Sequence, residues 1–424
     1  MRVVAASDSA AFEAISAAGW DPNEAVGVEV AQIIADVRDR GDAAVIEANR
    51  RFDGTNETAS TLRQTVPPLH ALRETIPPEI AAALELEMDR LSRVHQRQRL
   101  ANITQVDEDG TRYALLRRAF RSVAVYAPQQ GAAVAALMGA VPAKIAGVER
   151  IVVLSPARRD GISSSLLFAC ALCGVEELYV AGGAQAIAAA AFGTASLPAV
   201  DKIVGRGGLW TTEAKRQVFG RCGIDMLAGP AEILVVADDG ANSEYVVEEL
   251  LSAAEQSAAA RFAVVSESRS LLDAVAQLID SLDLQSLDNA TVSAAIGQRC
   301  RLILCNDGNE VFGVIDRFAP AYLCLHVRDA WAYLDRISRA AIVYIGDSTP
   351  LVAGAYLAGI NGVAPTSGGA RFASALSLSD FVHSISVVEN SAQRIAGDAS
   401  ALAALSESDG LAHHAQAARM RGGT

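Results

Sequence analysis

Ile151-Val152-Val153-Leu154 is a short apolar run followed by a helical segment, and this order recurs along the chain. Apolar runs without polar alternation are typical of parallel strands that are buried on both faces. Further runs of this kind lie at residues 123–126, 178–180, 233–236, 262–265, 302–304 and 342–345. The sequence therefore predicts an α/β protein with two Rossmann-like, open twisted sheets.

The segments that flank this alternation differ from it. Residues before about 120 are mainly helical, and Pro77-Pro78 opens a helix. The helical, polar tail has little core of its own, so it needs a docking surface such as a second subunit. We expect an N-terminal arm at 1–22, a discontinuous first α/β domain at 23–122 and 233–377, a second α/β domain at 123–232, and a helical tail at 378–424.

Composition and charge disfavour several classes of protein. The 424 residues carry a net charge of −13, which opposes attraction to nucleic acid or anionic lipid. The apolar runs are shorter than a membrane span, and the amino terminus has too short an apolar region for a secretory signal. We therefore expect a cytoplasmic protein that binds a small molecule and neither nucleic acid nor membrane.

Two glycine-rich turns are candidates for binding a phosphate. Gly205-Arg206-Gly207-Gly208 lies between a strand-like segment and a helical one, where backbone N–H groups can approach an anion. The spacing is not the G-x-G-x-x-G fingerprint, so a standard Rossmann site is not indicated. In the second turn, at residues 181–186, Gln185 either binds a ligand or caps the helix. The six histidines show no local metal-binding spacing.

Several longer motifs resemble the histidinol dehydrogenase family. The resemblance runs from about Arg40 to Arg421, and its most specific parts are at residues 142–148, 182–187, 201–205, 214–218 and 223–226. It implies the oxidation of histidinol to histidine in two NAD-dependent steps at a zinc ion. It also implies a homodimer in which the carboxyl-terminal tail crosses to the other subunit.

The family's zinc ligands are a Gln, two His and an Asp. By the resemblance they map to Ala253, Gln256, Ala355 and His414. A single imidazole cannot replace four ligands, so we expect no zinc here. The resemblance also maps an acidic substrate contact to Asp409. We take Asp409, His414 and Gln256 as candidate substrate-binding residues.

The family's Glu-His acid–base pair maps to Ala321 and Tyr322. Tyr322 and Glu255 are then the nearest candidates for proton transfer. The alternative is that Tyr322 fills the space of the lost imidazole and Glu255 braces its helix.

On the nucleotide side, Tyr126, Gln185 and Gly208 map to positions that contact NAD in the family. The loss of the family's asparagine at Gly208 predicts a weakened site for NAD or NADP. Arg206 is a candidate contact for a phosphate.

These replacements lead to two expectations of different classes. The first is a redirected, zinc-independent enzyme that acts on a small, less polar metabolite in biosynthesis. The second is a non-catalytic protein that acts as a dimeric binding or scaffold protein. Removing charged groups from a buried pocket lowers the cost of desolvation, which is compatible with both.

Overall fold

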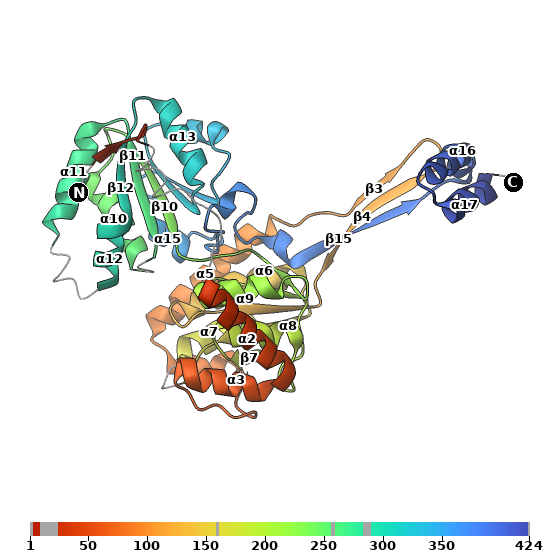
Figure 1. Cartoon of the computed structure of the whole chain (residues 1–424). Helices are drawn as coiled ribbons and strands as arrows, with labels where there is room; N and C mark the ends of the chain where they lie inside the picture. The colour runs from red at the N-terminus through yellow and green to blue at the C-terminus, as the bar shows by residue number, and fades with distance from the viewer. Residues whose placement is uncertain (1–2, 9–23, 158–160, 256–258, 283–289, 423–424) are drawn as a thin grey trace. The chain divides into compact units, whose positions relative to one another are not determined.

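The computed structural model describes residues 3–8, 24–157, 161–255, 259–282 and 290–422 (Figure 1). The chain divides into two compact units. Unit 1 spans Met1–Gln98 and Phe120–Phe381, and unit 2 spans Arg99–Ala119 and Val382–Thr424. Unit 1 contains two six-stranded sheets, which confirms the predicted α/β fold with two open sheets.

The first of these, here called the middle sheet, has the strand order β2-β7-β6-β5-β8-β9. Its strands are parallel except for β2, which runs antiparallel to β7. At its centre Val125 lies opposite Val153 and Val204, and all three are fully buried. Burial on both faces is why these runs are apolar throughout. The strands are β2 (Arg63–Thr65), β5 (Ser122–Tyr126), β6 (Arg150–Ser155), β7 (Glu177–Val180), β8 (Lys202–Val204) and β9 (Gly223–Ile224).

The helices of the amino-terminal region pack with the middle sheet. Helix α2 (Glu24–Arg40) contacts α8 (Gly183–Phe192), whose small alanine side chains allow close approach, and α9 (Leu209–Val218). The predicted grouping of residues 23–122 with 233–377 differs from this arrangement, because β2 also pairs in the middle sheet. The remaining helical segments here are α3 (Asp42–Ala48), the π-helix η1 (Asn49–Asp53), α4 (Leu69–Leu72), η2 (Arg73–Thr75), α5 (Pro78–Gln96), α6 (Ala132–Ala146) and α7 (Ser164–Leu172).

The second sheet, here called the flanking sheet, is parallel throughout and has the order β1-β12-β11-β10-β13-β14. Val3 lies opposite Leu302, so β1 is an edge strand of this sheet, while most of the predicted arm at 1–22 lies outside the described residues. The strands are β1 (Val3–Ala5), β10 (Glu232–Ala237), β11 (Arg261–Ser266), β12 (Cys300–Leu304), β13 (Tyr322–His326) and β14 (Ile342–Ile345). The helices are α10 (Ser243–Ala254), α11 (Arg269–Ser281), α12 (Ala290–Arg299), α13 (Gly308–Phe318), α14 (Ala330–Tyr333), η3 (Leu334–Arg336), α15 (Leu351–Ala355), η4 (Gly369–Arg371) and η5 (Leu378–Phe381).

Unit 2 is a three-stranded antiparallel sheet that carries two helices. The strands are β3 (Ile103–Val106), β4 (Arg112–Ala119) and β15 (Val382–Glu389), and the helices are α16 (Ala392–Ser408) and α17 (Ala412–Gly422). The two helices pack through Ala403, Ala415 and Ala418. The tail that was predicted to be helical therefore begins with a strand. Ile385 and Val387 alternate there with serine and valine, a pattern that suits pairing with β4.

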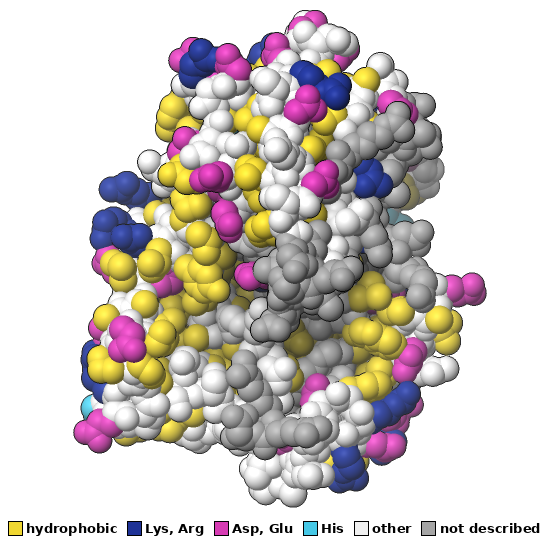
Figure 2. Space-filling view, turned by 90° about the vertical axis from the view of Figure 1, so that its left-hand side faces the viewer, with side chains coloured by type: hydrophobic (Ala, Val, Ile, Leu, Met, Phe, Trp, Pro, Cys, Tyr) yellow, Lys and Arg dark blue, Asp and Glu magenta, His cyan; other side chains and the backbone are white. Residues whose placement is uncertain are grey.

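Charged side chains of both signs are mixed on the surface. On the face drawn in Figure 2, basic and acidic groups lie next to one another rather than in areas of a single sign. In the described part of the chain, no helix is both long enough and apolar enough to cross a membrane.

Candidate functional site

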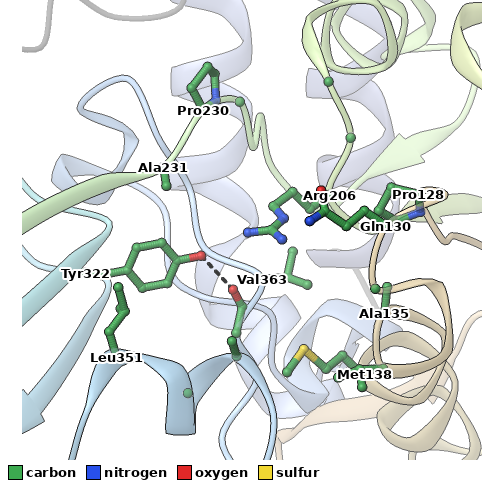
Figure 3. Close-up of a pocket in the computed structure, with 18 of the residues that line it drawn as sticks. Pro128, Gln130, Ala135, Met138, Arg206, Pro230, Ala231, Tyr322, Leu351 and Val363 are labelled. Atoms are coloured by element: carbon green, nitrogen blue, oxygen red, sulfur yellow. Dashed lines mark hydrogen bonds between the residues drawn. The ribbon is translucent and has the colours of Figure 1, made fainter. Parts of the chain in front are cut away.

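A cavity of about 410 Å³ is lined by residues from the middle-sheet part and the flanking-sheet part of unit 1 (Figure 3). Pro128 and Arg206 enter it from just beyond the carboxyl ends of β5 and β8. Ala231 and Tyr322 enter it from the amino ends of β10 and β13. Ligands of open α/β sheets bind beyond the carboxyl ends of the strands. The middle sheet therefore presents its binding edge to this cavity.

Arg206 supplies the only charge among the described residues that line the cavity. Its guanidinium points into the same space as the Tyr322 hydroxyl (Figure 3). The turn continues through Gly207-Gly208 into α9. A Cβ on Gly207 would lie 2.5 Å from the Thr211 Cβ, so only glycine fits there, whereas Gly208 faces open space. A cation beside the amino end of a helix is a favourable setting for an anion.

Tyr322, a predicted catalytic residue, lines the cavity and is buried. Its hydroxyl donates a hydrogen bond of 2.8 Å to the Gly362 carbonyl. Glu255, the other predicted catalytic residue, is exposed at the end of α10 and does not line the cavity. The structure therefore does not bring the two together at the cavity, and their catalytic role stays a prediction.

The predicted cofactor contacts fall in two places. Gly208 lines the cavity, whereas Tyr126 and Gln185 lie beneath the turn at Gly182-Gly183. The Tyr126 hydroxyl accepts the Gly183 N–H at 3.1 Å, and burial raises the pKa of this phenol. These contacts hold the turn from which α8 begins.

Gln185 also belongs to a buried polar group that sequence reasoning missed. Its Nε2 donates to the Asn49 Oδ1 at 3.2 Å and lies 3.5 Å from the Asp53 Oδ2. Burial and the nearby Glu57 raise the pKa of Asp53 to about 6. No sequence pattern marked Asp53, because Gln185 comes from a segment 132 residues away.

The predicted substrate-binding residues lie outside the described cavity lining. In unit 2, Asp409 directly follows α16 and His414 lies on α17, and both are exposed. Gln256 lies outside the described residues. These three assignments stay predictions.

The side chains at the mapped zinc positions do not fit a metal ion. Ala253 is fully buried and Ala355 lines the cavity, and neither has a ligating atom. Within the described ranges, no group of three or more His, Cys, Asp or Glu side chains is arranged to hold a metal ion. The expected absence of zinc stays a prediction that elemental analysis can test.

Tyr344 is a cavity residue that sequence reasoning missed. It is 2% exposed, and its ring stacks on Tyr322 with centroids 6.4 Å apart. No spacing in the sequence marks it, because its hydroxyl lies against Gly354, which belongs to a different element.

Three comparisons relate the chain to known proteins. The sequence model of the histidinol dehydrogenase family matches residues 20–422. The histidinol dehydrogenase of Rhodospirillum rubrum is 38% identical over 419 residues, which cover 97% of this chain and 96% of that protein. That of Syntrophotalea carbinolica is 35% identical and covers 99% of both. The crystal structure of histidinol dehydrogenase from Elizabethkingia anophelis matches with a TM-score of 0.88 at 27% identity, covering 98% of this chain and 96% of that one.

These matches confirm the resemblance but overturn the function expected from the replaced side chains. We expected a redirected, zinc-independent enzyme or a non-catalytic binding or scaffold protein. Relatives that are 35–38% identical over nearly the whole chain are instead named histidinol dehydrogenase. A replaced side chain changes one contact of the pocket. Similarity along the whole chain covers all the positions that build the pocket. The pocket also draws polar groups from other positions, such as Arg206 and Tyr344.

Proposed function

The chain belongs to the histidinol dehydrogenase family, and from this premise we propose that it oxidises histidinol with NAD as the electron acceptor. The observation that carries this proposal is the 38% identity to the Rhodospirillum rubrum enzyme over 97% of the chain. The cavity agrees with it, because a space of about 410 Å³ suits a small molecule.

The binding edge of the middle sheet fits a dinucleotide. Arg206 and the backbone N–H groups at the start of α9 would hold its phosphates by charge-assisted hydrogen bonds. Tyr126, Gln185 and Gly208 are the further contacts proposed from the resemblance, for NAD or for NADP. When bound, the nicotinamide accepts the electrons that leave the alcohol.

The opposite wall of the cavity is suited to position the substrate. The hydrogen bond from Tyr322 to the Gly362 carbonyl fixes the phenol ring against the cavity. On this wall Ala231, Ile233 and Leu351 supply apolar surface. Hydrogen bonds are stronger in such a setting than in water. We propose that Tyr322 holds a proton at its Oη beside the reacting carbon.

A homodimer is part of this proposal. Unit 2 exposes apolar side chains, which a second copy of the chain would cover. Those most exposed include Ile103, Val106, Val388, Leu405 and Met420.

A turnover measurement tests the proposed activity. The purified full-length chain is mixed with NAD and L-histidinol, and the formation of NADH is followed. L-alaninol, an amino alcohol without the imidazole ring, is the control substrate. We expect NADH with L-histidinol and little with L-alaninol. A preparation that binds NAD but forms no NADH with L-histidinol would contradict the proposed substrate.

A further inference from the structure

Tyr344 carries a buried hydroxyl that has no hydrogen-bond partner among the described residues. The side chain lines the cavity and is 2% exposed. Its neighbour Tyr322 differs in this respect, because the Tyr322 hydroxyl donates to the Gly362 carbonyl. The two stacked rings thus both line the cavity, and of their hydroxyls only that of Tyr322 has a hydrogen-bond partner among the described residues.

The surrounding backbone makes room for this hydroxyl. A Cβ on Gly354 would lie 1.8 Å from the Tyr344 Oη, so the phenol extends into space that only a glycine leaves open. Gly354 belongs to α15 and also lines the cavity. The α15 helix is in turn held at its start, where the Leu351 N–H donates to the Glu249 carboxylate at 2.8 Å. The hydroxyl therefore sits at a defined place in the wall.

A buried hydroxyl without a hydrogen-bond partner lowers the free energy of unfolding. A phenylalanine would fill the ring's place without that cost. A phenol keeps its proton at neutral pH, since its ordinary pKa is about 10. It is therefore a hydrogen-bond donor that awaits an acceptor.

We propose that the Tyr344 hydroxyl positions the substrate by donating a hydrogen bond to a nitrogen of the substrate's ring. This rests on the proposed function, since an imidazole nitrogen is the acceptor that histidinol offers. The geometry of the pair assigns separate roles: Tyr322 is fixed by Gly362, and Tyr344 is reserved for the ligand. Tyr344 is in this sense a positioning residue that acts on binding and not on the chemical step.

The test compares Tyr344→Phe with Tyr179→Phe as a matched control. Tyr179 is also fully buried, but its hydroxyl donates to the Asp42 carboxylate at 3.3 Å and accepts from the Ser196 hydroxyl at 3.3 Å. Thermal unfolding is measured for both full-length variants, alone and with L-histidinol. Without ligand, Tyr344→Phe raises Tm and Tyr179→Phe lowers it. With ligand, the rise in Tm shrinks for Tyr344→Phe and is kept in Tyr179→Phe.

Kinetics give a second readout. We expect Tyr344→Phe to raise the KM for L-histidinol about tenfold, the effect of one hydrogen bond, with kcat nearly unchanged. The KM for NAD stays the same. A lower Tm of free Tyr344→Phe together with an unchanged KM would show a purely structural hydroxyl and overturn the proposal.

Imidazole separates this inference from the proposed function. If the wild-type chain does not bind L-histidinol, the proposed substrate is wrong, and imidazole then tests Tyr344 alone. A rise in Tm with imidazole that is lost in Tyr344→Phe supports the contact. Equal responses of the two proteins, or no response in either, overturn it.

Discussion

Arg206 places a cation in a cavity whose other described lining residues carry none. At the scale of single residues, it is the group that sets the charge of the ligand the cavity receives. Its place beyond β8, just before α9, favours the phosphates of a dinucleotide over histidinol, whose amino group carries a positive charge. The two ligands of the proposed reaction would thus meet different walls.

We expect Arg206→Gln to weaken NAD binding about tenfold or more, because a charge-assisted hydrogen bond is lost. Titration of the dinucleotide measures this. The control is Arg121→Gln. The Arg121 side chain is 86% exposed, and its Nε forms a surface ion pair with the Glu149 carboxylate at 3.7 Å. Equal affinities of Arg206→Gln and the wild-type chain would refute the assignment.

At the scale of elements, a buried ion pair holds the turn that carries Arg206. Lys215 on α9 and Asp225 beyond β9 pair with almost no exposure. Lys215 also donates to the Gly205 carbonyl at 2.9 Å, and the Gly205 N–H donates to Asp225 at 2.8 Å. Gly205 has a φ of 114°, which favours glycine. Strand, turn and helix are thereby locked together.

Asp225→Asn should lower the free energy of unfolding by about 3–5 kcal/mol, because it leaves the Lys215 charge buried without its partner. Urea denaturation measures the change. Asp273→Asn is the control, since the Arg269–Asp273 pair on α11 is exposed, and its loss should cost less than about 1 kcal/mol. Similar unfolding curves for the two variants would mean that the pair does not hold the turn.

Elements were easier to predict than the site. The strands β5, β6, β7, β10, β11, β12 and β14 were identifiable because burial on both faces makes them largely apolar. The strands β1, β2, β9 and β13 were not predicted. Glu255 shows the limit: it follows the buried Ala253 and Ala254, but the helix turns it toward solvent. Tyr344 could not be found from spacing, because its role depends on the missing side chain of Gly354. The strand β15 was overlooked because Ile385, Val387 and Val388 are exposed and polar residues interrupt the apolar ones, so the segment has no buried apolar run.

At the scale of the whole molecule, unit 2 has a small buried cluster but exposes several large apolar side chains on its surface. Three alanines form the buried cluster between α16 and α17, while Leu405 and Met420 are 67% and 69% exposed. Such a surface is expected at an interface between copies of the chain.

We expect the wild-type chain to elute as a dimer, with its mass measured by light scattering, and Leu405→Glu to shift it toward the monomer. A buried charge is costly in an apolar interface. Phe219→Glu is the control, because Phe219 is equally exposed at 69% but belongs to unit 1. A monomeric wild-type chain, or dissociation by the control alone, would contradict an interface built by unit 2.

We expect this cavity to support the NAD-linked oxidation of histidinol. The stoichiometry of the complete reaction tests this, with L-histidine quantified by chromatography alongside the NADH produced. Converting the alcohol to the carboxylate removes four electrons, so we expect two NADH for each L-histidine formed. Absence of L-histidine after long incubation of the dimeric chain with both substrates would contradict it.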